Sequence, residues 1–235
     1  MKIQEDLTKY ISSALSNNLP EKTQTKTRFH LLDAIVSILT GRLLPPGQKG
    51  FNFSKKQGGV EEATLLGNNL KVSAINAGFS NGMAAHANET DDSHTKGRFH
   101  PGCAIIPTTL AIAEKENLGS DEIIKGIALG YDIGVRFTTS LGYKTPKTSI
   151  FATHSIGPIF GSAASAGALL KLTHEQCNYL ISYTVQQASG LACWNRDPDH
   201  IEKAFVFSGM TSRNAIYSAL FCLLYTSPSP RDLAR

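Results

Sequence analysis

The segment that most constrains the fold is GSAASAGALLKL, residues 161–172, in which nearly every side chain is small or aliphatic. Small side chains let helix backbones approach each other closely, so we expect this segment to be a helix buried among other helices. It belongs to a succession of helical patterns. Apolar residues recur at helical spacing over residues 3–15 and 29–39, and again from about 210 to 224. The chain is therefore predicted to be mostly α-helical.

Two helix starts are marked by local sequence patterns. Ser120 resembles an N-cap residue, and the acids that follow it, Asp121 and Glu122, suit the positive end of a helix dipole. Thr173 and Gln176 have the spacing of a capping box and predict the start of another helix.

The middle of the chain gives weaker signals. Residues 46–72 are rich in Gly and Lys, and we interpret them as loop with a short strand. A helix is predicted to follow from Val72 to about Glu89. The sequence contains no βαβ alternation with a glycine-rich phosphate-binding motif, so a Rossmann or P-loop domain is not expected.

Composition limits the classes of protein that need to be considered. With 41% hydrophobic and 18% charged residues among 235, the chain fits a globular protein. Its formal charge of +4 is not concentrated in a basic cluster, so no nucleic-acid partner is expected. No apolar run is long enough to span a bilayer, and the start lacks a secretory signal. The four cysteines form no CxxC pair, which predicts reduced thiols and a cytoplasmic location, with a mitochondrial one left open for a eukaryotic source.

The composition changes abruptly in LYTSPSPRDLAR, residues 224–235, where two prolines exclude a continuing helix. This stretch resembles translated adapter sequence, and we expect residues 225–235 to lie outside the native fold. Residues 1–224 are then interpreted as one helical domain that is incomplete at its C-terminal end.

The run HANETDDSHTKGRFHP, residues 86–101, concentrates three histidines and three acids. If the preceding helix continued for one more turn, it would place four polar residues near one face: His86, Glu89, Asp92 and Ser93. Histidine exchanges protons near neutral pH, so a proton-transfer site is one interpretation. A metal site and a solvated loop remain alternatives, although the spacing matches neither HExxH nor an EF-hand.

A resemblance favours the first interpretation. AAHANETDDSHTKGRFHPGCAIIPTTLAIAE is similar to the signature segment of the MmgE/PrpD family. Four further segments resemble family motifs in the same order along residues 1–224: LLDAIVSILTGR before it, and GYDIGVRF, THSIGPIFGSAASAGALLKL and QASGL with HIEKAFVFSGMTSRNAIYSAL after it.

The resemblance implies a fold and an activity. The family includes 2-methylcitrate dehydratase, cis-aconitate decarboxylase and related epimerases. Its members have a large all-helical domain and a smaller α+β lid, assemble as homodimers, and need no metal or other cofactor. We therefore expect the helical part of a metal-independent lyase for a small di- or tricarboxylate, as a homodimer, with the lid absent from this chain and no membrane partner.

The resemblance also assigns residues by position. His100 is expected to be the proton shuttle, with Asp92 and Glu89 orienting it or handling a second proton. His154 and Lys203 would bind and polarise a substrate carboxylate. The remaining substrate-binding candidates are Ser93 and Arg98.

Each assignment has an alternative. His154 could be a helix cap, Lys203 could be a surface lysine, and Trp194 is expected to pack in the core rather than to line a pocket. Three other histidines are predicted to be surface residues: His94, His174 and His200. At the level of function, the alternatives are decarboxylation or epimerisation, a non-catalytic helical dimerisation module, and a metal-dependent hydrolase.

Overall fold

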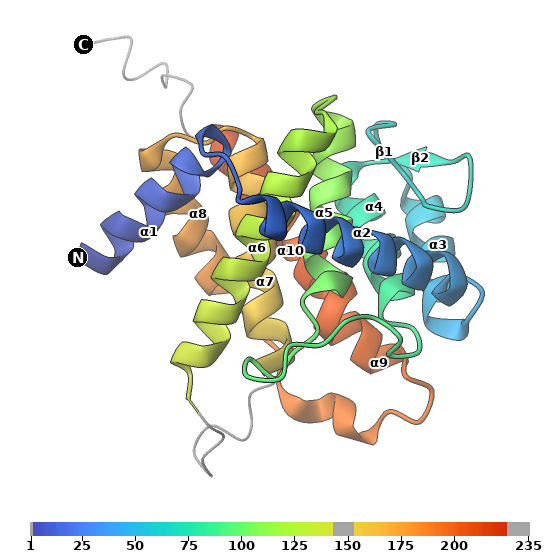
Figure 1. Ribbon diagram of the computed structural model, residues 1–235. Helices are drawn as coiled ribbons and strands as arrows, with labels where there is room; N and C mark the ends of the chain where they lie inside the picture. Colours follow the sequence, from blue (N-terminus) through green and yellow to red (C-terminus); the bar gives the residue numbers. More distant parts are fainter. Residues whose placement is uncertain (1, 143–152, 225–235) are drawn as a thin grey trace, which may run out of the picture.

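The computed structural model describes residues 2–142 and 153–224, which form a helical domain with one two-stranded sheet (Figure 1). This confirms the mostly α prediction. The helices of the first half are α1 (Lys2–Ser13), α2 (Glu21–Gly41), α3 (Pro45–Gln57), α4 (Ala74–Ala85) and α5 (Gly102–Lys115). Those of the second half are α6 (Ser120–Ser140), α7 (Thr153–Leu169), α8 (His174–Gln187), α9 (Ile201–Ala204) and α10 (Met210–Leu224). Short 3₁₀ turns cover Ala14–Ser16 and Ala192–Arg196, and a π-helical turn, Phe205–Gly209, joins α9 to α10.

The small-residue helix lies where the sequence predicted. Helix α7 is in contact with α1, α5, α6, α8 and α10, and the last four surround it in Figure 1. Every residue from 157 to 169 is buried. Its Ile159, Ala163 and Leu169 belong to the main hydrophobic core. Helix α7 is thus a central element around which the domain is assembled.

Glycines set the distance between α6 and α7. A Cβ atom added at Gly161 would lie 2.4 Å from the carbonyl oxygen of Gly130, and one added at Gly134 would lie 2.9 Å from that of Gly157. Real Cβ atoms do not approach oxygen so closely, so the two backbones can meet here only because these positions carry no side chain. The close packing fixes where α7 begins relative to α6.

Helix α4 is the second buried helix, and it is shorter than predicted. We expected it to extend to about Glu89, but it ends at Ala85 with His86 as its C-cap, and Glu89 has a left-handed backbone with φ of 56°. The prediction that one helical face carries these four residues is therefore wrong: His86, Glu89, Asp92 and Ser93. The chain turns away from the helix axis instead, which allows Asp91 to reach back to the His86 ring.

The interpretation of residues 46–72 as loop was wrong for its first part, which is helix α3. Pro45 and Pro46 open this helix, where a missing backbone N–H has no cost. Gly47 and Gly50 then let α3 pack against the end of α2 and against Met83. The short strand is confirmed as part of an antiparallel pair of β1 (Ala63–Thr64) with β2 (Lys71–Val72).

Both predicted helix starts are present. Thr173 accepts a hydrogen bond from the backbone N–H of Gln176, whose side chain accepts one from Thr173 N, so the capping box is confirmed. At α6, Gly119 rather than Ser120 occupies the N-cap position, and Ser120 is the first helical residue. The predicted acids, Asp121 and Glu122, lie in the first turn.

Three further predictions concern the whole chain. The four cysteines are free thiols, and three of them are buried: Cys103, Cys177 and Cys222. None of the helices among the described residues has the length and apolar character needed to cross a membrane. The tail predicted to lie outside the native fold, residues 225–235, is outside the described residues.

Candidate active site

Three segments that are far apart in the sequence meet at one end of the helical domain. They are the loop of residues 86–101 after α4, the first turn of α7, and the segment of residues 192–207 that leads through α9. In Figure 1 they lie together at the lower end, below the ends of α5, α7 and α10. Most of the titratable residues that the sequence singled out lie here.

Asp91 is the centre of this cluster. Its carboxylate is almost fully buried and lies 3.0 Å from Nδ1 of His86 through both oxygens. The same carboxylate lies 3.4 Å from Nδ1 of His100. The two imidazole rings are edge to face with centroids 4.8 Å apart. One carboxylate therefore hydrogen-bonds to Nδ1 of His86 and lies within ion-pair distance of Nδ1 of His100.

The surroundings give the two histidines opposite properties. Burial lowers the pKa of His86, and the bond to Asp91 only partly offsets this effect, so His86 is neutral and donates its Nδ1–H. Burial also acts to lower the pKa of His100, but the hydrogen bonds and charges of Asp91 and Asp92 together outweigh it, and the pKa is raised. Although burial by itself would raise the pKa of Asp91, the bonds to both histidines hold it well below its usual range. His100 is therefore the more readily protonated of the pair.

Asp92 faces a different set of partners. Its carboxylate accepts hydrogen bonds from Tyr131 Oη at 2.7 Å and from the backbone N–H of Gly102 at 2.8 Å, and it lies 2.8 Å from Nδ1 of His30. A Cβ at Gly102 would lie 2.6 Å from Asp92 Oδ1, so the glycine makes room for this contact. Asp92 thus binds the first turn of α5 and connects it to α2 and α6.

His154 and two aromatic residues form one wall of the cluster. The His154 ring stacks on Phe207 with centroids 4.4 Å apart and lies 6.0 Å from the His100 ring. Trp194 packs against both His154 and Phe207. The expectation that Trp194 packs in the core rather than beside a pocket is thus wrong, since it also lines a cavity of about 590 Å³.

Lys203 and Glu89 form an ion pair beside the histidines. Lys203 Nζ lies 5.3 Å from the Trp194 ring and 5.6 Å from the Phe207 ring. His200 completes the group, with Nε2 3.8 Å from Glu89 Oε1 and its ring 5.3 Å from that of His86. Lys203 is accordingly partly buried in the cluster, and His200, predicted to be a surface residue, belongs to the cluster too.

Backbone strain is concentrated at the same place. Five non-glycine residues among those described have positive φ, and three of them lie in these segments: Glu89 (56°), Arg98 (51°) and His200 (60°). The other two, Asn117 and Lys171, follow the ends of helices α5 and α7. Left-handed backbone at non-glycine residues away from helix ends costs energy and is often retained at functional sites.

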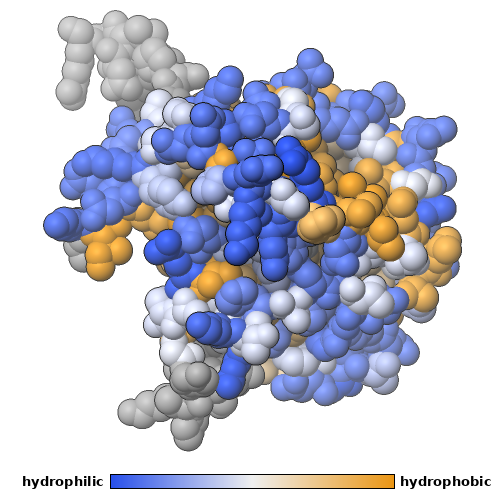
Figure 2. Space-filling model, viewed as in Figure 1, coloured by the Kyte–Doolittle hydropathy of each residue, from blue (hydrophilic) through white to orange (hydrophobic). Residues whose placement is uncertain are grey.

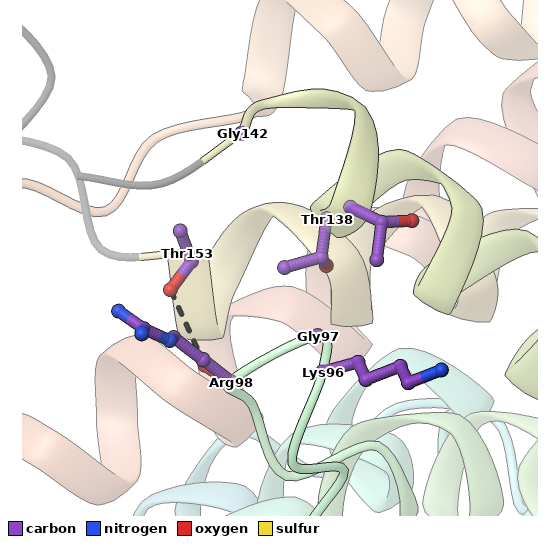
Figure 3. Close-up of a pocket in the computed structure, with 7 residues that line it drawn as sticks. Lys96, Gly97, Arg98, Thr138, Gly142 and Thr153 are labelled. Carbon is purple, nitrogen blue, oxygen red and sulfur yellow. Dashed lines mark hydrogen bonds between the residues drawn. The ribbon is translucent and has the colours of Figure 1, made fainter. Parts of the chain in front are cut away.

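Arg98 lines a pocket on the flank of the cluster, shown in Figure 3. The pocket has a volume of about 270 Å³ and lies between the loop tip, the end of α6 and the start of α7. Thr153 Oγ1 donates a hydrogen bond to the backbone oxygen of Arg98 at 3.3 Å. Lys96 and Arg98 extend in opposite directions from the loop on either side of Gly97. Ser93 is exposed on the same loop.

The comparison with known families adds to this geometry. The MmgE/PrpD N-terminal domain family matches residues 5–224. The chain belongs to the MmgE/PrpD family. A comparison with curated protein sequences gave no significant match. Since the match covers all the segments that form the cluster, the histidines, Lys203 and the acids described above lie within the MmgE/PrpD N-terminal domain.

The residues assigned from the family resemblance include part of the cluster. The structure brings together His100, His154, Lys203 and Glu89, as predicted, and sets Asp92 against His30 and Tyr131. Sequence analysis did not single out Asp91, and it left His86 without an assigned role. The adjacent pair Asp91 and Asp92 was a sequence signal for this contact. Adjacent side chains in a loop point in different directions, so only one of the two carboxylates could face His100.

Potential metal ligands also come together in this part of the chain. His86, Glu89 and His200 each offer one ligand atom within 4.8 Å of those of the other two. His86, Asp91 and Cys103 form a second such group, which is entirely buried.

Proposed function

We propose that the protein is a lyase that uses these histidines to move protons on a small di- or tricarboxylate, by dehydration as in 2-methylcitrate dehydratase. The observation that carries the proposal is the buried Asp91 carboxylate, which lies 3.0 Å from Nδ1 of His86 and 3.4 Å from Nδ1 of His100, in a cluster that also contains Lys203. The pKa of His86 is lowered and that of His100 is raised. A proton donor and an acceptor with separated pKa values are what acid–base dehydration requires. No step of this proposal needs a metal.

Dehydration of a β-hydroxy acid removes a carbon-bound proton and the hydroxyl group, giving a carbon–carbon double bond and water. In the proposed reaction His100, protonated through its contact with Asp91, donates a proton to the leaving hydroxyl. A second group accepts the carbon-bound proton. The candidates are His154, whose ring lies 6.0 Å from that of His100, and Glu89. Asp91 keeps the His100 ring oriented so that Nε2 is the atom that exchanges the proton.

Binding of the substrate carboxylates requires cations near the histidines. Lys203 supplies one ammonium group inside the cluster, where charge-assisted hydrogen bonds are stronger than in water. Arg98 and Lys96 supply positive charge at the flanking pocket, next to Thr153 and thus one residue from His154. A substrate with carboxylates at two ends could interact with both groups of cations.

The same groups support two alternative reactions. In decarboxylation of the cis-aconitate type, the protonated His100 would deliver its proton to the carbanion left by carbon dioxide. In epimerisation, two groups on opposite faces of one carbon would remove and return a proton, and His100 and His154 lie 6.0 Å apart by ring centroids. Product analysis distinguishes these reactions, because dehydration releases water and gives a carbon–carbon double bond, decarboxylation releases carbon dioxide, and epimerisation gives an isomer of the same composition.

The test is a turnover measurement on 2-methylcitrate and cis-aconitate with the complete protein, including the lid domain that the family resemblance implies. His100→Ala should lower turnover at least about 100-fold, the usual contribution of a general acid or base. His94→Ala is the matched control, since His94 lies on the same loop with its Nδ1 accepting a bond from Gly97 N, and its removal should leave turnover unchanged. Retention of activity by His100→Ala would remove His100 from the mechanism.

We also propose that the protein is a homodimer. Helix α2 and the turn after it expose a stripe of large apolar side chains with the 3–4 spacing of a helix-pairing seam: Phe29, Leu32, Val36, Leu39 and Leu43. These side chains are 41–66% exposed, and orange side chains gather over this region in Figure 2. A second copy of the same helix would cover such a stripe. If the dimer forms but a citrate analogue releases no heat on addition, the chain is instead a helical dimerisation module without catalysis.

A further inference from the structure

One ring nitrogen of His86 lacks a hydrogen-bond partner among the described residues. The His86 side chain is fully buried, and its Nε2 has no hydrogen-bond partner among the described residues. Leaving a buried polar atom unpaired costs free energy, so such an atom at a functional site indicates a ligand. The other ring nitrogen, Nδ1, is already occupied by Asp91.

The arrangement is that of a metal-binding histidine. A metal-bound imidazole commonly donates its other ring N–H to a carboxylate, which fixes the tautomer and the direction of the ligating nitrogen. Asp91 stands in that position relative to His86. The free Nε2 is then available as a ligand atom, and His86, Glu89 and His200 each offer one ligand atom within 4.8 Å of those of the other two.

We propose that His86, Glu89 and His200 bind a zinc ion, and that zinc reversibly inhibits the enzyme by occupying the site. Two imidazoles and one carboxylate are a ligand set found in zinc enzymes with a fourth, open position. Ligands of a tetrahedral zinc at about 2.0–2.1 Å lie roughly 3.3 Å apart, so the side chains need to move by about 1 Å. Glu89 and His200 are partly exposed and lie in loop backbone, which allows this movement.

Lys203 explains why this site would be regulatory. Its ammonium group is paired with the Glu89 carboxylate and competes with any cation for it. Zinc binding must displace Lys203, which weakens the affinity. The same displacement removes Lys203 from its position for a substrate carboxylate. Inhibition rests on the proposed function, whereas binding of the ion does not.

Isothermal titration of the metal-stripped protein with zinc chloride at neutral pH tests the site. One zinc per chain is expected, with affinity at least about 10-fold lower in Glu89→Gln and in His200→Asn. Lys203→Met should bind zinc more tightly than the unmodified protein, because it removes the competing charge. His174→Asn, on helix α8, and Cys103→Ser are matched controls that should bind as the unmodified protein does.

Several results would overturn the proposal. They are the absence of saturable binding, equal affinity in the Glu89 and His200 variants, or loss of binding in Cys103→Ser, which would place the ion in the buried His86, Asp91 and Cys103 group. Circular dichroism of each variant excludes misfolding as the cause of a loss. A protein that binds zinc in this pattern but turns over no polycarboxylate refutes the proposed function alone. An active protein that binds no zinc refutes only this inference.

Discussion

The Asp91 carboxylate is shared between two imidazole rings and sets their protonation states. Its hydrogen bond and charge only partly offset the effect of burial on the pKa of His86, whereas together with Asp92 they outweigh the effect of burial on the pKa of His100. Asp91 and Asp92 are adjacent in the sequence, yet the first contacts the histidines and the second contacts Tyr131 and the start of α5. Sequence analysis favoured Asp92 because of its position in the segment that resembles the family signature, and because a helix was expected to continue through Glu89. The direction of a loop side chain depends on tertiary contacts, which no local pattern predicts.

The pKa values of the two histidines should lie on opposite sides of that of an ordinary histidine, with His86 below it and His100 above it. The raised pKa of His100 means that its contribution to stability is fully present below about pH 6.5 and is lost as the pH rises through its folded pKa. The lowered pKa of His86 means that its contribution is present above about pH 6.5 and is lost as the pH falls. Nuclear magnetic resonance of the ring nitrogens measures both titrations. A His100 pKa below that of a free histidine would contradict this assignment.

Helix α7 shows how a sequence pattern can specify an element and its environment together. Its small residues predicted burial correctly, and the capping box at Thr173 predicted the next helix start, because both signals depend on residues close in the sequence. Helix α3 and the end of α4 were missed, because they depend on partners far away. Gly47 and Gly50 are unfavourable for an isolated helix and are compensated only by packing against Gly41 and Met83.

The contact between α6 and α7 should tolerate no added methyl group at its closest point. In Gly130→Ala the new Cβ would lie 2.5 Å from Ile105 Cγ2 and 3.0 Å from the backbone oxygen of Gly161. We expect a loss of about 1–3 kcal/mol in the free energy of unfolding, measured by chemical denaturation. Gly126→Ala, on the same helix, faces only the movable side chains of Ser165 and Leu169 and should cost less. Equal losses in both variants would refute the close-packing explanation.

At the scale of the whole molecule, the site depends on three segments brought together by α4, α7 and α9. Collinear motifs placed His100, His154 and Lys203 in one domain, and the structure shows that they lie together. Tyr131 and His200 lie within two of these motifs and His30 directly precedes another, but the motifs assigned them no role. His30 and Tyr131 are helical residues from α2 and α6, and only the packing of those helices brings them to Asp92. Sequence therefore identified the helical domain and part of the cluster, while the hydrogen-bond partners required the tertiary structure.

The apolar stripe on α2 should control the oligomeric state. Charged groups introduced in its centre by Leu32→Asp with Val36→Asp would be buried without partners in a dimer, so the variant should sediment as a monomer. Val185→Asp, at an equally exposed apolar position on α8, is the control and should not change sedimentation. If the stripe variant remains dimeric in analytical ultracentrifugation, a different surface forms the interface.

The most direct test of the central claim is loss of the hydroxyl group from the substrate. The complete protein, incubated with 2-methylcitrate, should form the unsaturated tricarboxylate and water, as measured by mass spectrometry of the product. His100→Ala should lose most of this activity, and His94→Ala should retain it. Unchanged product formation in His100→Ala would contradict the claim that the histidines held by Asp91 are the proton-transfer site.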